Sequence, residues 1–348
     1  MKSKLFAALF AFLLTSQVST AQKFDTTYIK SYHDKFFLWP VLKQRTSTFK
    51  LEDPATPSKN AEFRPNNSYG LGLGVYMFDL GFELVFGIPV ERQKEYTYGK
   101  TSATDLQLNI LSRRWGADLV YQRYKGFYLS NPNTPVPVGA QYPQRPDIVT
   151  ETLGVSGIYV FKPQRFSLRS AFTFADRQLK SKGSFLLSGT FSNFEIEGDS
   201  AILNPTYTAL LGATNSFNKL NYRTYSVAPG YAYNFVIKKN FFLSLLFAVG
   251  PAVQDFRFRD TNGESHSSTK VNSFVDGRLA FGYSNDRFFT GVTIATQTRN
   301  VVFENVRFGS TSATFRILFG WRFKESGFLK KSVWDLLPPW GKKEVKSE

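Results

Sequence analysis

Residues 314–323 read TFRILFGWRF, and this stretch decides the fold. One face of an extended chain would carry its aromatic and aliphatic side chains: Phe315, Ile317, Phe319, Trp321 and Phe323. The opposite face would carry Thr314, Arg316, Gly320 and Arg322, interrupted only by Leu318. Side chains alternate between two faces in a strand, whereas a helix repeats every ~3.6 residues, so the pattern predicts an amphipathic β-strand.

The same alternation recurs in about a dozen segments between Tyr69 and Phe323, many of them near the ~9–11 residues with which a tilted strand crosses a bilayer. Clear examples are residues 105–110, 115–122, 166–174 and 224–237. Single-chain bacterial barrels have an even number of strands. We therefore predict an all-β fold, a transmembrane antiparallel β-barrel of about 12 strands, with a range of about 12–14.

Composition separates this barrel from the alternative, a soluble β-sandwich. Aromatic residues make up 17% of the 348 residues, with 36 Phe and 17 Tyr, yet the mean hydropathy is −0.23. A soluble protein would have to bury most of these rings, whereas a membrane barrel turns them towards lipid and the two interfaces. Aromatic residues at segment ends, such as Trp115, Tyr121, Tyr231 and Trp321, favour the barrel.

The N-terminus predicts export. Lys2 and Lys4 precede an apolar run at 5–14, and small residues at 19–21 supply a cleavage site, which is the layout of a secretory signal peptide. We therefore divide the chain into a signal peptide (1–21), an N-terminal segment (22–67, with a possible first strand at 36–50), a barrel (68–324) and a basic periplasmic tail (325–348). These features predict a location in the outer membrane of a Gram-negative bacterium.

Charge indicates the kind of partner. The chain has 43 basic and 27 acidic residues, and without Lys2 and Lys4 the mature chain has 41 basic residues and a net charge of +14. Because nucleic-acid binding fits poorly with export, we expect no nucleic acid and, instead, contact with outer-membrane lipid, including lipopolysaccharide. The absence of cysteine excludes disulfides and thiolate metal sites. The sequence identifies no protein partner.

The connections between segments follow a short–long alternation that is typical of barrels with periplasmic turns and external loops. We predict tight turns at 78–79, 112–114, 162–165, 238–240 and 285–287, and long loops at 90–102, 130–148, 198–221, 254–270 and 299–312. With residues 36–50 included, the strand count is odd, which conflicts with the even number expected, and the miscounted segment lies between Asp147 and Tyr222. Three explanations give an even number: residues 198–213 contain a further strand, residues 184–196 form a loop, or residues 36–50 lie outside the wall.

Alternation also predicts which charged side chains face the barrel interior. They are Glu83, Asp105, Asp118, Arg169, Asp276, Arg278, Arg316 and Arg322. Opposed acids and bases of this kind can line a pore for ions or small solutes, which is our first hypothesis. The alternative is a closed structural or assembly barrel, in which the charges pair with each other and function belongs to the loops or the tail.

Candidate catalytic residues are few. His266 lies between Ser265 and Ser267, and a lipid-modifying outer-membrane enzyme would need a histidine beside a serine. Serines abound in exposed loops, so we expect no enzymatic activity. No group of residues has metal-ligand spacing, and we expect neither metal nor cofactor. The glycines at 70, 72 and 74 alternate within a strand and are better explained as relieving crowding on its inner face.

Several motifs resemble one family. Its opening is similar to residues 25–32 (Asp-Thr-Thr-Tyr-Ile-Lys-Ser-Tyr) and 34–36 (Asp-Lys-Phe). Further similar points are Arg64-Pro65-Asn66-Asn67, Lys180-Ser181-Lys182-Gly183-Ser184-Phe185, Phe217-Asn218-Lys219-Leu220 and Gly230-Tyr231-Ala232-Tyr233. Together, from Asp25 to Phe323, they resemble the Bacteroidota outer-membrane family described as domain of unknown function 4421. The resemblance implies an outer-membrane barrel and brings no activity and no catalytic residues.

Overall fold

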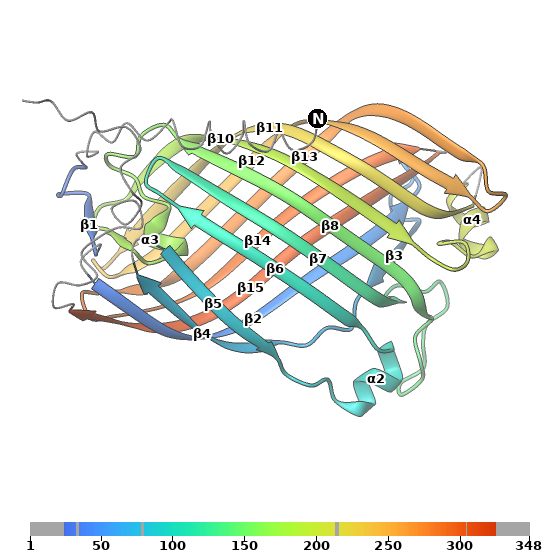
Figure 1. Ribbon diagram of the computed structural model, residues 1–348, viewed down its shortest axis with the longest axis horizontal. Coiled ribbons are helices and arrows are strands. Elements are labelled where there is room, and N and C mark those ends of the chain that lie inside the picture. Colours follow the sequence, from blue (N-terminus) through green and yellow to red (C-terminus); the bar gives the residue numbers. More distant parts are fainter. Residues whose placement is uncertain (1–23, 33–34, 78–79, 213–215, 304, 325–348) are drawn as a thin grey trace, which may run out of the picture.

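The computed structural model describes residues 24–32, 35–77, 80–212, 216–303 and 305–324, in which the chain forms one long antiparallel sheet that closes on itself (Figure 1). The strands of this sheet are β2 (Lys35–Glu52), β3 (Asn60–Arg64), β4 (Gly70–Met77), β5 (Leu80–Gly87), β6 (Ser102–Leu111), β7 (Trp115–Leu129), β8 (Gln144–Val160), β10 (Lys182–Glu197), β11 (Phe217–Ile237), β12 (Phe241–Asp260), β13 (Ser265–Ser284), β14 (Phe288–Phe303) and β15 (Val306–Lys324). The predicted all-β antiparallel barrel is confirmed. The predicted signal peptide, the basic tail and the turn at 78–79 lie outside the described residues.

Smaller elements complete the chain. A separate pair of short strands joins β1 (Ile29–Ser31) to β9 (Asp176–Gln178). The helices are α2 (Arg92–Tyr98), α3 (Arg169–Phe172) and α4 (Pro205–Leu211). Over the residues that the structure describes, none of the helices has the length and apolar character to cross a membrane.

The wall closes through a ring of 10 of the 13 strands in the sheet. We call the end of the barrel with the turns at 112–114, 238–240 and 285–287 the turn end, and the opposite end the loop end. β15 pairs with β2 along nearly its whole length, and the loop end of β2 pairs with β3. β3 then joins β7 through Phe63↔Leu129 and Arg64↔Tyr128. The remaining three strands flank the junction of β3 and β7: β4 pairs with the turn-end half of β2, β5 pairs with β4, and β6 pairs with β7. The candidate strand at 36–50 therefore lies in the wall as β2.

The two faces of the wall differ in polarity. On β12, Phe241, Leu245 and Phe247 are exposed on the outside, whereas Ser244 and Ala248, which alternate with them, are fully buried inside. The same outward pattern holds on β15, where Ile317, Phe319, Trp321 and Phe323 are exposed. An outward apolar belt over a polar inner face is the arrangement of a transmembrane barrel. Leu318, the exception in the sequence pattern, points inward and packs in a buried apolar cluster.

Several strands continue beyond the belt. β11 has 21 residues and β12 and β13 have 20 each, about twice the ~9–11 needed to cross a bilayer. The predicted loops at 254–270 and 299–312 were therefore wrong, because β12 runs to Asp260, β13 starts at Ser265, and β14 and β15 fill the second range. Outward residues become polar where a strand leaves the bilayer, so apolar alternation ends there although backbone pairing continues.

The predicted strand at 166–174 was also wrong, and the turn predicted at 162–165 does not lead into a wall strand. Residues 161–181 connect β8 to β10 and carry α3 and β9 instead of a wall strand. Phe166, Leu168 and Phe174 do alternate, but all three are buried inside the barrel. None of the three explanations of the strand count applies, because residues 36–50 lie in β2, residues 184–196 lie in strand β10 and residues 205–211 form helix α4. Without the 166–174 segment, the described sheet consists of 12 longer strands and the short β3, which makes 13.

Gly74 shows how close packing shapes the inner face. A Cβ atom at this position would lie 1.9 Å from Cε2 of Trp39, which is buried across the β2–β4 pair. The glycine thus makes room for the indole, whose Nε1 donates a hydrogen bond to Glu83 (3.1 Å). Relief of crowding, as predicted, accounts for this glycine.

Candidate functional site

The turn end of the barrel is filled by the segment between β8 and β10. Figure 1 shows α3 within the outline of the barrel at the end where β1 lies. Side chains of this segment join two buried apolar clusters with the inner faces of wall strands, and Phe174 stacks on Phe289 with ring centroids 4.7 Å apart. β1 pairs with β9 of the same segment. This segment, residues 161–181, is called the plug from here on.

Two wall arginines hold the plug by its backbone. Arg316 donates to the carbonyl oxygen of Phe172 (2.6 Å), and Arg322 donates to that of Phe174 (2.7 Å). Asn234, on β11, donates to the carbonyl oxygen of Ser167 (2.9 Å). Charged donors that reach buried carbonyl oxygens form strong hydrogen bonds, so these contacts fix the plug to opposite parts of the wall.

The loop end is closed by a second apolar core. Inward aromatic side chains from several strands meet there, including Phe49, Phe194 and Tyr222, each at most 2% exposed. Tyr207 and Leu211 of α4 pack into the same cluster. Figure 1 places α4 at the end of the barrel opposite α3. Both ends of the lumen are therefore occupied by packed side chains.

Between these two cores lies an internal cavity of about 290 Å³, called the chamber from here on. Glu83 accepts hydrogen bonds from Lys43 (2.7 Å) and Arg316 (2.7 Å). Arg278 forms ion pairs with Asp118 (2.8 Å) and Asp276 (3.2 Å). Arg45 pairs with Asp105 at 2.7 Å. Most of the charged side chains that line the chamber are thus held in ion pairs.

The structure places the predicted inner-face residues in two groups. Glu83, Asp118, Asp276, Arg278 and Arg316 line the chamber, and Asp105 lies beside it through Arg45. Arg322 lies at the turn end against the plug. Arg169 belongs to α3 of the plug and not to a strand, and it donates a hydrogen bond to the hydroxyl of Tyr76.

Sequence reasoning missed three basic residues of the chamber, namely Lys43, Arg45 and Arg299. The first two lie on β2, and their side chains could have been assigned by extending the alternation of residues 36–50. Arg299 fell in a predicted loop, but it lies on β14 and is only 5% exposed. Its position depends on a strand that continues past the apolar belt.

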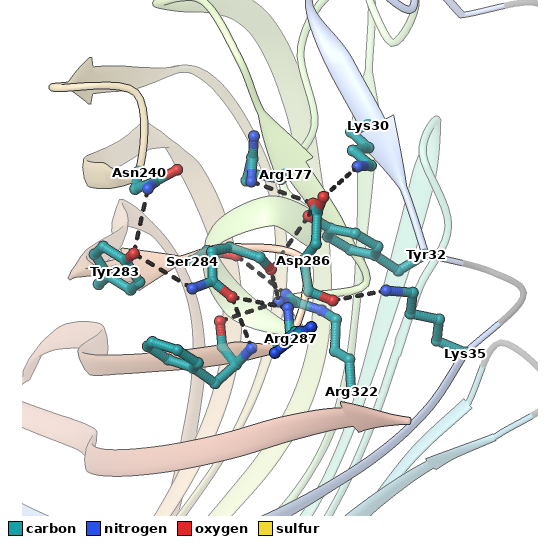
Figure 2. Close-up of polar contacts among 12 residues, drawn as sticks. Lys30, Tyr32, Lys35, Arg177, Asn240, Tyr283, Ser284, Asp286, Arg287 and Arg322 are labelled. Atoms are coloured by element: carbon teal, nitrogen blue, oxygen red, sulfur yellow. Dashed lines mark hydrogen bonds and ion pairs between the residues drawn. The ribbon is translucent and has the colours of Figure 1, made fainter. Parts of the chain in front are cut away.

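A polar network ties the N-terminal segment to the turn between β13 and β14 (Figure 2). Asp286 accepts hydrogen bonds from Lys30 (2.7 Å) and Tyr32 (2.8 Å), and Arg177 of β9 forms an ion pair with it (3.3 Å). The hydrogen bond from Lys30 in particular holds the pKa of Asp286 below its ordinary value of 3.8. The network anchors β1 and also β9, the strand of the plug that pairs with β1.

His266 does not form the serine pair that an enzyme would require. It lies on β13 beside Asp260 (3.7 Å) and stacks on Phe258 with ring centroids 4.8 Å apart. Ser265 and Ser267 are its neighbours along the strand, and adjacent strand residues point to opposite faces. Both serines therefore point away from the imidazole.

The family model described as "Domain of unknown function (DUF4421)" matches residues 23–323. The chain belongs to this family. No curated protein has significant sequence similarity to this DUF4421 chain.

Among solved structures, the DUF4421 chain is similar to the outer membrane protease OmpT from Escherichia coli, with 9% identity, a TM-score of 0.37, and 84% of this chain and 98% of that chain covered. It is similar to the translocator domain of autotransporter NalP from Neisseria meningitidis, with 11% identity, a TM-score of 0.32, and coverage of 92% and 97%. It is also similar to Ail from Yersinia pestis, with 9% identity, a TM-score of 0.24, and coverage of 83% and 99%.

Replacing Arg322 by Met should loosen the plug. The change leaves the buried carbonyl of Phe174 without its charged donor, and an unsatisfied buried acceptor costs about 1–3 kcal/mol. We expect a lower thermal unfolding temperature and faster amide hydrogen exchange in residues 161–181. Arg307→Met, which removes a basic partner of Glu52 at the loop end, is the matched control. Equal exchange of the plug in both variants would contradict the anchoring role.

The Asp286 network should depend on pH. Because the folded-state pKa lies below 3.8, the stabilisation is fully present above that value and is lost as the pH falls through the folded-state pKa. Hydrogen-exchange protection of residues 24–32 should therefore fall in acid, and Asp286→Asn should reduce it already at pH 7. Asp255→Asn, which removes an exposed carboxylate at the loop end, should leave that protection unchanged. Protection that is independent of residue 286 would disprove the tether.

Proposed function

We propose that this chain is an outer-membrane barrel that closes the lumen at both ends and holds a small ligand in the chamber, rather than a standing diffusion pore. The observation that carries the proposal is the position of the chamber between two packed apolar cores. The signal peptide predicted from the sequence and the outward apolar belt support a location in the outer membrane, and we propose membrane lipid, including lipopolysaccharide, as the surrounding partner. A volume of about 290 Å³ is near the lower end of ligand pockets, which run from ~300 Å³.

A binding role is favoured over an enzymatic one. The chamber contains paired carboxylates and guanidinium groups, and it is lined by no histidine within the described residues. The serine neighbours of His266 point away from it, so the one arrangement that suggested hydrolysis has no nucleophile in place. We therefore propose that the protein binds and does not transform its ligand.

A gated pore is the second candidate, and one observation favours it. The plug is a single connection whose backbone is held by side chains such as Arg316 and Arg322. The plug is not a wall strand, so its polar contacts and its packing in the two apolar clusters can be released without breaking the wall. Transport of ions or small solutes would then require movement of the plug.

Single-channel recording in planar bilayers separates the closed chamber from a pore. We expect the refolded wild-type protein, with folding confirmed by its resistance to denaturation in detergent, to give no stepwise current. Stepwise currents in the wild type whose ion selectivity changes in Arg316→Gln would contradict the closed chamber. Currents that appear only in Arg322→Met would support the gated pore.

A further inference from the structure

The wall has an unpaired seam between β5 and β6. β5 pairs with β4 over its whole length and β6 pairs with β7, but no backbone hydrogen bond joins the facing edges of β5 and β6 in the described chain. Figure 1 shows the two strands as neighbours in the wall. Towards the loop end, hydrogen bonds of Asn66 fix the seam. Its side-chain Nδ2 donates to the carbonyl oxygen of Gly99 (2.7 Å), and its backbone N–H donates to Thr101 Oγ1 (2.8 Å).

The chamber reaches this seam. Its lining includes Phe82, Leu84 and Leu108, which lie on the outward face of β5 and β6, together with the inward Glu83 and Gln107. Leu84 is 72% exposed. Alternate residues of a strand point to opposite sides of the wall, and at the unpaired edges of β5 and β6 the chamber is lined by residues of both faces. The chamber therefore extends to the seam, next to the apolar belt.

An open edge in this position needs polar surroundings. Backbone groups without partners are costly in lipid and are tolerated at membrane depth only where they are buried in protein or line a polar cavity. The inward residues Gln107 and Asn109 of β6 and Glu83 of β5 provide such a lining. The seam thus joins an apolar outer rim to a polar interior within a few residues.

The chamber also contains one basic side chain, Arg299, that has no carboxylate partner among the described residues. Its carboxylates are already engaged: Glu83 by Lys43 and Arg316, and Asp118 and Asp276 by Arg278. Of the described carboxylates, none forms an ion pair with Arg299, which donates only to Gln297 Oε1 (2.9 Å) and leaves its buried Nε without an acceptor. A guanidinium group in this state is a site for a carboxylate, which it can bind through two parallel hydrogen bonds.

We propose that the seam between β5 and β6 is a lateral portal for an anionic single-chain amphiphile, whose carboxylate enters the chamber and pairs with Arg299 while its alkyl chain stays in the bilayer. This proposal rests on the closed chamber and specifies its ligand. A cavity of about 290 Å³ accommodates a head group and a few carbons, so the remaining chain has to pass between Leu84 and Leu108. The apolar rim and the basic interior match the two ends of such a molecule.

Tryptophan quenching tests the entry of the ligand. Trp39 lines the chamber, and replacing the other four tryptophans (Trp115, Trp321, Trp334 and Trp340) by Phe leaves it as the single reporter. With the full chain in phosphatidylcholine vesicles, 2-bromododecanoate should quench Trp39 saturably, whereas uncharged 2-bromododecanol should not saturate. Arg299→Gln should raise the half-saturating concentration about tenfold, and Arg299→Lys should restore much of it. Equal behaviour of Arg299→Gln and wild type would overturn the assignment of the carboxylate.

Cross-linking tests the route. The chain has no cysteine, so a Leu84→Cys/Leu108→Cys pair bridged by a bifunctional maleimide locks the seam alone. Matched controls bridge paired strands through the cross-strand partners Leu73 and Leu84, or Leu108 and Leu119. We expect the seam bridge to abolish saturable quenching and both controls to retain it. Equal quenching in all three would overturn the portal.

Two further outcomes distinguish failure of the portal from failure of the closed chamber. A barrel that carries no current and whose Trp39 is not quenched by 2-bromododecanoate would overturn the portal and leave the closed chamber standing. Quenching of Trp39 by water-soluble 2-bromopropionate in the seam-locked protein would show entry through an end of the barrel. That result would overturn both proposals.

Discussion

The structure depends on one constraint, which is that backbone amides and carbonyls inside a bilayer must find partners within the protein. In the part of the chain that the structure describes, thirteen strands satisfy it by pairing into a sheet that closes where β15 meets β2 and where β3 meets β7. The facing edges of β5 and β6 are the exception, and the polar chamber behind them explains why an exception is tolerated. Function is proposed at the place where the constraint is relaxed.

The interior follows from the same physics. Charges taken out of water are stable only when they are paired and hydrogen-bonded, and the chamber pairs Glu83 with two bases and Arg278 with two acids. Apolar side chains of the described residues pack into clusters at both ends of the lumen. Arg316 serves two parts of this design, because it pairs with Glu83 and holds the plug by the carbonyl of Phe172.

The sequence was informative where one strand face meets lipid. The alternation at 314–323 predicted β15 and its outward face, and the interior position of Leu318 explains its one irregularity. The alternation at 166–174 misled, since a plug that packs on the inner wall shows the same apolar spacing as a strand that faces lipid. The period of the pattern alone does not distinguish an apolar face that contacts lipid from one that packs inside the barrel.

The chamber was only partly predictable for a related reason. Glu83, Asp118, Asp276, Arg278 and Arg316 lie in strands with apolar partners, so their inner position could be read from the pattern. Arg299 lies where β14 has left the apolar belt, and the pattern there resembles a loop. The missing pairing of β5 and β6 depends on contacts between strands, about which the local sequence carries no signal.

Thiol labelling in membranes tests the central claim, a chamber that is closed to water at both ends and open to lipid at the side. Ser156 is 6% exposed and lines the chamber, while Ser267 is exposed at the loop end. The account predicts that Ser156→Cys reacts with a membrane-partitioning maleimide and not with a charged, membrane-impermeant reagent, whereas Ser267→Cys reacts with both. Rapid reaction of Ser156→Cys with the impermeant reagent would contradict it.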